Sequence, residues 1–380
     1  MDLRYSDEDE AFRAELRAWL AAELAVLAPQ PVRDDWDARR RWDTDWQRRL
    51  FDAGYAGLSW PKEYGGQDAS PSRQLVFLEE TTRARAPYVG VNFVGLLHAG
   101  PTIVAEGTDE QKAAHLPKIL RGEEVWCQGF SEPEAGSDLA SLRTRAVRDG
   151  DHYVVTGQKI WCSFGQVGDF GELLVRTDPD APKHQGITWL ILPMDLGGIE
   201  VRPLKTVLGS SEFVELFLDE VRVPVECRVG EENDGWRVTN VTLSFERGTA
   251  FVSELVDATR LVEDLAPYVS DPAQRRELGH VAAELDAVWA LTKRNVTQAS
   301  RGVSGRGAFM IKLAYSEARQ KLGELSLRAL GRDALVVDGV GEFVEERLRT
   351  LALTIAAGTS QIQRNILGER VLGLPKESSR

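Results

Sequence analysis

The run from Trp126 to Ala140 reads WCQGFSEPEAGSDLA and carries aromatic, amide and hydroxyl side chains beside two glycines. Side chains of these types, next to backbone N–H groups that glycine leaves accessible, are suited to line a planar polar ring. A Gly-Ser-Asp turn also occurs at ordinary junctions between domains. Taken alone, the run leaves both interpretations open.

Two further segments carry similar side chains. Residues 156–163 read TGQKIWCS, and residues 356–364 read AAGTSQIQR. Trp161 in the second segment is either a core tryptophan or part of a binding site, because tryptophan occurs in both settings. The presence of all three segments in one chain favours a shared site.

Several common catalytic motifs are absent from the sequence. No GxGxxG follows a predicted strand and no GxxxxGK[ST] occurs, so the usual phosphate-binding loops for NAD or ATP are missing. The absence of GxSxG weakens a hydrolase interpretation. The three cysteines and five histidines show neither CxxC nor HExxH spacing. We therefore predict no metal site, no disulfide framework and a reducing compartment.

Size and charge limit the classes of protein that remain. A chain of 380 residues is large enough for two or three subdomains. A formal net charge of -13 argues against sequence-independent binding of nucleic acid. The acidic N-terminus has no apolar signal core, and no apolar run reaches spanning length, so we predict a cytoplasmic protein without a membrane span.

The hydrophobic pattern changes twice along the chain. Ser6 is a candidate N-cap for a first amphipathic helix, and Thr108 begins another. After Trp126 the pattern favours strands, with an Asp149-Gly150 turn and candidate strands at 187–192 and 213–218. From Asp234, a candidate N-cap, the helical pattern returns. One face of the first helix carries Phe12, Leu16, Trp19, Leu20 and Leu24.

This pattern predicts an α+β protein with an N-terminal α-helical domain (1–125), a middle β domain (126–233) and a C-terminal helical bundle domain (234–380). With that order, the three segments together resemble the acyl-CoA dehydrogenase family, and the resemblance covers essentially the whole chain. It implies an N-terminal all-α domain, a middle β-sheet or barrel domain and a C-terminal four-helix bundle. It also implies FAD bound between the sheet and the C-terminal helices.

The resemblance implies which residues form the cofactor site. Ser163 is expected to place its hydroxyl near the reactive flavin nitrogen, and Ser137 is expected to border the thioester or the pantetheine. The cofactor-binding residues that it implies are Trp126, Gln128, Phe130, Ser131, Trp161, Ser163, Thr359, Ser360 and Gln361.

The expected reaction needs a carboxylate that removes the α proton, and burial beside substrate improves a glutamate for this task. Many family members place this glutamate before the Gly-Thr of the third segment, where this chain has Ala357. Ala357 and Gly358 are therefore expected to contact substrate through backbone groups. Part of the family supplies the base from the first long helix of the C-terminal domain, which implies Glu246. The alternative for Glu246 is a solvated helix residue, and adjacent Arg247 is assigned to the CoA side or to helix packing.

The chain departs from the family in two places. Residues 265–278 lack the Arg-rich segment ending in Phe-Gly that reaches the FAD pyrophosphate, and Arg275 and Arg276 are the candidate substitutes. Residues 330–334 replace a Gln-x-x-Gly-Gly element. These departures resemble actinobacterial-type subunits that act on bulky polycyclic acyl-CoAs, some of which form mixed tetramers.

The predicted function is FAD-dependent α,β-dehydrogenation of a branched or bulky acyl-CoA, with electron-transfer flavoprotein as electron acceptor. We expect a homotetramer or heterotetramer from the family resemblance. Three alternatives remain: a subunit that needs a partner chain, a flavin monooxygenase or oxidase on the same fold, and a binding protein without cofactor.

Overall fold

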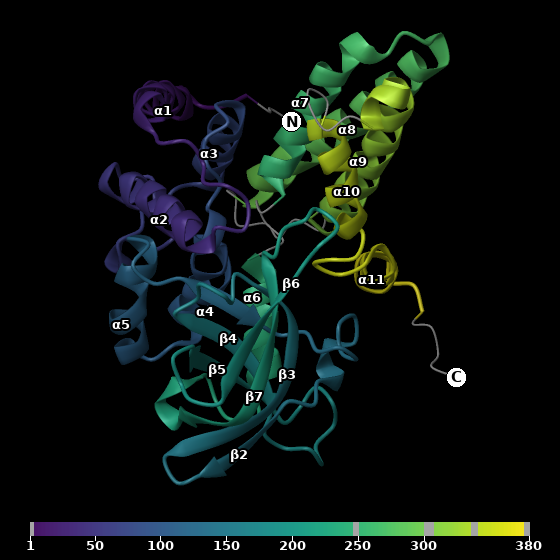
Figure 1. The fold of residues 1–380 in the computed structure, drawn as a ribbon. Coiled ribbons are helices and arrows are strands. Elements are labelled where there is room, and N and C mark those ends of the chain that lie inside the picture. The colour runs from purple at the N-terminus through teal and green to yellow at the C-terminus, as the bar shows by residue number, and fades with distance from the viewer. Residues whose placement is uncertain (1–3, 246–250, 300–307, 336–340, 376–380) are drawn as a thin grey trace. The chain divides into compact units, whose positions relative to one another are not determined.

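The structure is a computed structural model that describes residues 4–245, 251–299, 308–335 and 341–375 (Figure 1). The chain separates into two compact units. The helical unit consists of Met1–Val26, Ser70–Ala86 and Arg247–Arg380, and the sheet unit consists of Leu27–Ala69 and Pro87–Glu246. Helices precede and follow the strands along the chain, which confirms the predicted α+β class.

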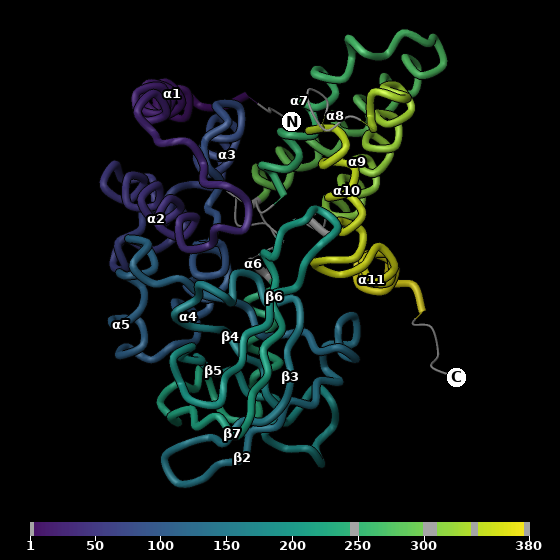
Figure 2. The backbone as a smooth tube through the Cα atoms, in the orientation of Figure 1, coloured from purple at the N-terminus to yellow at the C-terminus, as the bar shows by residue number. Residues whose placement is uncertain are grey.

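The sheet unit is built on an eight-stranded sheet with the path β6-β7-β3-β2-β4-β5-β8, and β1 pairs with β4 in parallel. The long antiparallel pair β3 and β7 runs side by side in Figure 2. The strands predicted at 187–192 and 213–218 are confirmed as β5 and β7. The strands are β1 (Trp126–Gly129), β2 (Arg145–Asp149), β3 (His152–Ser163), β4 (Phe170–Arg176), β5 (Ile187–Pro193), β6 (Ile199–Leu204), β7 (Phe213–Pro224) and β8 (Arg228–Val229).

The turn between β2 and β3 has the predicted chemistry. Gly150 has a φ of 62°, a left-handed conformation that glycine adopts without steric cost. The two strands that the turn joins alternate, so that Ala146, Tyr153 and Val155 are buried in one core cluster with residues of β4, β5 and β7. Alternation of this kind is what a sheet with one buried face requires.

Helix α5 (Asp109–Leu120) begins where the sequence predicted. At the start of α5, Gln111 N donates to Thr108 Oγ1 over 3.2 Å, and Thr108 N donates to Gln111 Oε1 over 3.0 Å. This reciprocal capping box satisfies two backbone N–H groups that have no carbonyl partner within the helix. The described helices of this unit are α2 (Trp36–Asp52), α4 (Gly100–Glu106), α5 (Asp109–Leu120) and α6 (Gly235–Phe245).

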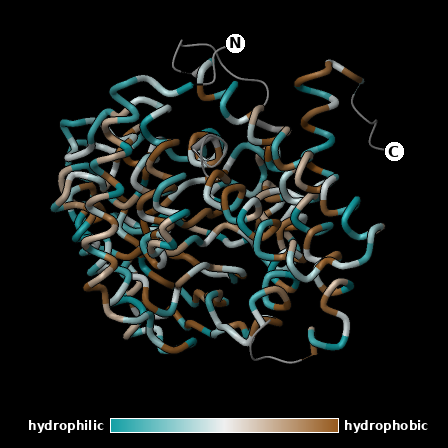
Figure 3. Tube along the Cα trace, turned by 90° about the horizontal axis from the view of Figure 1, so that it is seen from above, coloured by the Kyte–Doolittle hydropathy of each residue, from teal (hydrophilic) through white to brown (hydrophobic). Residues whose placement is uncertain are grey.

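The first helix of the helical unit is also confirmed. Asp9 N donates to Ser6 Oγ over 3.1 Å, and the predicted face buries Leu16 and Leu20. Apolar and polar segments alternate along the helices in Figure 3, as amphipathic helices require. The described helices of this unit are α1 (Asp7–Val26), α3 (Pro71–Arg83), α7 (Val252–Leu265), α8 (Pro272–Ala299), α9 (Ala308–Leu330), α10 (Gly341–Leu353) and α11 (Ser360–Ile366).

Helix α3 packs with the C-terminal helices although it lies far from them in sequence. Leu75 of α3 is buried in one cluster with Val252 and Val256 of α7 and Val296 of α8. Each compact unit is therefore defined by which residues pack together, and it consists of separate stretches of the sequence. The predicted domain limits at residues 125 and 233 stay a prediction.

Candidate active site

The first segment begins with a tryptophan that is enclosed in the sheet unit. The Trp126 ring stacks on Phe170 with centroids 5.2 Å apart, and the His115 ring meets it edge-on at 5.1 Å. The residue is 0% exposed, so its ring packs inside the unit and presents no surface to a ligand. Gln128 is partly buried, whereas Phe130 is buried.

The first and second segments lie next to each other. Ile160 N donates to Ser131 O over 2.9 Å. The Lys159 ammonium donates to Phe130 O over 3.1 Å and to Glu132 Oε1 over 2.8 Å. The structure therefore joins the two segments through one main-chain bond and one buried lysine.

Lys159 is 0% exposed, and burial lowers its pKa against the opposing effect of Glu132. Glu132 in turn accepts the backbone N–H groups of Arg143 and Thr144, over 2.7 and 2.8 Å. Burial on its own would raise the pKa of Glu132, but Lys159 and these N–H donors hold that pKa below its usual range. The Lys159–Glu132 ion pair and its hydrogen bonds to the backbone fix the turn that follows β1.

Trp161 lies on an irregular part of β3. The register of β3 against β7 shifts between Lys159 and Cys162, which is the signature of a bulge. Trp161 has a φ of 62° and is 56% exposed, and its ring touches Phe213 edge-on at 5.8 Å. The alternative that Trp161 is a core tryptophan is therefore wrong. Strained left-handed residues of this kind cluster at functional sites.

Each of these two segments contains one further serine assigned to the site. Ser163 is the last residue of β3, pairs with Phe213 of β7 and is partly buried. Ser137 is exposed and lies beyond the bridge that joins Glu132 to Ala135. Both residues therefore keep some exposed surface.

The third segment lies in the helical unit and forms a strained turn before α11. Ala357 and Gly358 are both left-handed, with φ of 51° and 83°. Gln363 Nε2 donates to Ala357 O over 3.1 Å, and Lys312 Nζ donates to Gly358 O over 2.7 Å. Because both carbonyls are held, the direction of the peptide groups in the turn is fixed.

The three predicted cofactor residues of this segment have different settings. Thr359 is the N-cap of α11, and its Oγ1 accepts from Ile362 N over 3.2 Å. Gln361 is exposed. Ser360 is buried, and its Oγ has no hydrogen-bond partner among the described residues. An enclosed hydroxyl without a partner is costly unless a ligand supplies one.

The predicted base, Glu246, and its neighbour Arg247 lie outside the described residues. Helix α6 ends at Phe245 and α7 begins at Val252. The assignment of both residues therefore stays a prediction.

Three family models match successive parts of the chain. They are the acyl-CoA dehydrogenase N-terminal domain at residues 6–123, the middle domain at 127–221 and the C-terminal domain at 233–372. The chain belongs to the acyl-CoA dehydrogenase family. The predicted fold, with its N-terminal helices, middle sheet and C-terminal bundle, is thereby confirmed.

Similar acyl-CoA dehydrogenases cover nearly the whole chain. "Acyl-CoA dehydrogenase IpdE1" of Mycobacterium tuberculosis is 37% identical over 97% of this chain and 98% of its own length. "Acyl-CoA dehydrogenase FadE34" of the same species is 40% identical over 97% of this chain and 50% of its own length. The predicted enzyme class, an oxidoreductase of the acyl-CoA dehydrogenase type, is confirmed.

Two similar solved structures have the same fold. The "Tcur3481-Tcur3483 steroid ACAD" has a TM-score of 0.85 and 33% identity, with 99% of this chain and 100% of that chain covered. The "ChsE4-ChsE5 complex from Mycobacterium tuberculosis" has a TM-score of 0.84 and 34% identity, with the same coverage.

Of the two arginines suggested for the FAD pyrophosphate of an acyl-CoA dehydrogenase, one has a local partner. Arg275 Nε donates to Val269 O over 2.9 Å, which ties the start of α8 to the preceding turn. Arg276 is exposed. Both arginines stay candidates, since their remaining N–H groups are available.

Glu254, in the first turn of α7, is a residue that no sequence pattern singled out. Its Oε2 atom is enclosed without a hydrogen-bond partner among the described residues, although other parts of the side chain reach the surface. Arg319 donates to the backbone oxygen of Glu254 and forms an ion pair with Glu346. Burial raises the pKa of Glu254 to about 7.

Glu254→Gln is expected to change how stability depends on pH. In the folded protein the carboxyl titrates at about 7, but near its ordinary value of about 4.3 when unfolded. The folded state therefore binds more protons between these values, so the free energy of unfolding falls by up to about 4 kcal/mol as pH rises from about 4.3 to 7. In urea titrations the variant should exceed wild type in stability at pH 8.5 and match it near pH 4. Exposed Glu263 provides the matched control, Glu263→Gln; equal curves for both variants would contradict the assignment.

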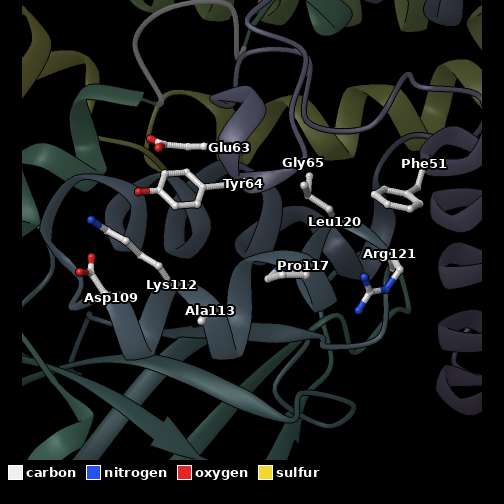
Figure 4. A pocket seen from close by; sticks show the side chains of 10 residues that line it. All are labelled: Phe51, Glu63, Tyr64, Gly65, Asp109, Lys112, Ala113, Pro117, Leu120 and Arg121. Carbon is white, nitrogen blue, oxygen red and sulfur yellow. The ribbon is translucent and has the colours of Figure 1, made fainter.

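The sheet unit has a cavity of about 460 Å³ away from the predicted site residues (Figure 4). Apolar surface of the cavity comes from Phe51, Tyr64 and Leu120. Two positive charges line it as well, Lys112 within α5 and Arg121 at the C-terminal end of α5. None of its lining residues belongs to the three segments, so the cavity has no part in the assigned chemistry.

No group of His, Cys, Asp and Glu with the geometry to hold a metal occurs among the residues that the structure describes. Within the same residues, no helix is both long and apolar enough to cross a membrane.

Proposed function

We propose that this chain is a FAD-dependent enzyme that oxidises the Cα–Cβ bond of a branched or bulky acyl-CoA thioester. The observation that carries the proposal is the joining of the first two segments, in which Ile160 N bonds Ser131 O beside the exposed Trp161 ring. An aromatic face held by a bulge next to hydroxyl groups suits a planar ring with polar edges. A similar structure is named a steroid ACAD, which supports a bulky acyl group.

The residues present fit a bound FAD. We assign Gln128, Phe130, Ser131, Trp161 and Ser163 to the flavin ring, and Thr359, Ser360 and Gln361 to FAD bound by this or a neighbouring subunit. The unpartnered hydroxyl of Ser360 is the observation that supports this fit. The Thr359 hydroxyl accepts from Ile362 N as the cap of α11, and its O–H group can still donate to the cofactor. Trp126, which is fully buried, would support the site by packing against Phe170 and His115. When bound, FAD supplies an acceptor for the hydride that leaves the β carbon.

Glu246 would take the α proton onto a carboxylate oxygen. The backbone N–H of Ala357 would donate to the thioester oxygen, where negative charge develops as the proton leaves, and Gly358 would border the same group. The held carbonyls of both residues support this role, because a fixed turn needs no reorganisation during reaction. Ser137 and Arg247 are assigned to the CoA side.

The test is anaerobic titration of the purified protein with short, branched, long and steroid-like acyl-CoAs while the visible flavin spectrum is recorded. We expect one class of thioester to bleach the flavin absorbance, and that class identifies the acyl group of the substrate. A yellow protein that no thioester bleaches would contradict dehydrogenation. Electron-transfer flavoprotein should then reoxidise the bleached protein, whereas rapid reoxidation by oxygen with release of peroxide would favour the oxidase alternative.

A second candidate is a subunit that needs a partner chain, in a heterotetramer instead of a homotetramer. It is favoured by the similarity to the ChsE4-ChsE5 complex. Co-expression with a second acyl-CoA dehydrogenase chain should then raise the flavin content and change the mass in solution. An unchanged flavin content would count against this candidate, and a monomeric mass would count against both tetramers.

A further inference from the structure

We propose that Glu172, a buried carboxylate on β4, is a positioning residue that sets the orientation of the Gln128 amide at the flavin site. The inference rests on the proposed function, because Gln128 has a part in the chemistry only if the chain binds a flavin. Glu172 belongs to none of the three segments.

Three polar side chains from three elements meet inside the sheet unit. Gln128 Nε2 donates to Glu172 Oε1 over 2.7 Å and lies 3.0 Å from His98 Nδ1. His98 Nδ1 lies 3.3 Å from the same Glu172 oxygen. Gln128 of β1 and Glu172 of β4 are register partners in the parallel pair, so their side chains leave the same face of the sheet. His98 comes from the π-helical turn η3 (Gly95–Ala99), a type of turn that is frequent at functional sites.

These contacts permit one orientation of the Gln128 amide. The amide nitrogen carries two hydrogens, one for the carboxylate oxygen and one for His98 Nδ1 in the tautomer that leaves Nδ1 unprotonated. The reversed amide would place its oxygen 2.7 Å from the carboxylate oxygen of Glu172, and two acceptors repel each other at that distance. Gln128 Oε1 is therefore left as an acceptor, and it accepts no hydrogen bond from any described residue.

Burial makes this arrangement rigid. Glu172 is 0% exposed and His98 is 3% exposed, so bulk water does not compete for their hydrogen bonds. The remainder of β4 is mostly apolar and buried, with the sequence FGELLVR. A carboxylate in such a strand is costly unless it is bonded, and its hydrogen bond to Gln128 reaches the first segment. Glu172 thus presents the Gln128 oxygen ready to accept from a ring N–H group.

The test measures FAD affinity of the apo-protein by quenching of flavin fluorescence. Glu172→Leu frees the amide to rotate and is expected to weaken FAD binding about tenfold, the effect of roughly one hydrogen bond. Glu172→Gln keeps an oxygen that can accept from Gln128 Nε2, so its FAD affinity should stay within about twofold of wild type. In a Gln128→Leu background, Glu172→Leu should cause no further loss, because the residue through which Glu172 acts is gone.

An equal loss from Glu172→Leu with and without Gln128 would overturn the inference, as would a tenfold loss in Glu172→Gln. The second of these outcomes decides the matter even if Glu172→Leu does not fold. Glu200→Gln is the matched control, since Glu200 is an exposed carboxylate on β6 that pairs with Arg202. Wild-type protein that binds no FAD would overturn the proposed function together with this inference, whereas tight wild-type binding with additive variants would overturn the inference alone.

Discussion

Glu246→Gln is expected to lower the rate at which an acyl-CoA bleaches the flavin by about 10²–10⁴-fold, the usual contribution of a positioned general base. Glutamine has nearly the same shape as glutamate but cannot hold the α proton at neutral pH. The variant should therefore stay yellow and bind the thioester. Stopped-flow absorbance under anaerobic conditions measures the rate, and the unreacted spectrum reports flavin content.

The chain offers a matched control for this variant. Glu263→Gln removes an exposed carboxylate from α7 and should react at the wild-type rate. Equal bleaching by wild type and Glu246→Gln would remove Glu246 from its role. Because Ala357 occupies the position at which many family members carry the base, no carboxylate in the third segment can replace it.

Local patterns in the sequence predicted much of the fold. The cap at Ser6, the capping box at Thr108 and the turn at Gly150 each depend on residues within a few positions of one another. Such signals are readable because the chemistry that ends or begins an element is carried by the element itself. Strands β5 and β7 were predicted for the same reason, from continuous or alternating apolar residues.

The setting of Trp161 needed the structure. An apolar strand containing a tryptophan is compatible with a core position and with a site position. The register shift between β3 and β7 decides between them, because the bulge turns the indole outward. Such a shift depends on the partner strand, about 50 residues further along the chain, and no local pattern encodes it.

The polar pairs that support the first segment were missed for a related reason. Lys159 and Glu132 are separated by 27 residues, and His98 and Glu172 by 74. A charged residue within an apolar strand was a usable signal in both cases, since lysine and glutamate are rarely buried without a partner. The sequence does not name that partner, because topology brings it close.

Lys159→Met is expected to be the most destabilising of the substitutions considered, by about 3–5 kcal/mol. The lysine is fully buried, and its removal leaves the Glu132 carboxylate, whose side chain is 9% exposed, without its cation. It also leaves Phe130 O without its ammonium donor. Urea unfolding followed by far-ultraviolet circular dichroism measures the loss, and flavin release at sub-denaturing urea reports the loosened turn.

Comparison with a double variant distinguishes an uncompensated charge from lost packing. In Lys159→Met/Glu132→Gln no buried charge remains unpaired, so part of the stability should return, as replacement of both partners of a buried ion pair commonly allows. The amide that this substitution introduces can still accept one of the N–H bonds from Arg143 and Thr144 that Glu132 accepts now. If the double variant is less stable than Lys159→Met by as much as Glu132→Gln alone destabilises the wild type, the two substitutions are additive. The Lys159–Glu132 ion pair would then not be what holds the turn. Recovery of stability without recovery of flavin affinity would show that the Lys159–Glu132 pair, with the bond from Lys159 to Phe130 O, orders the backbone that carries Ser131.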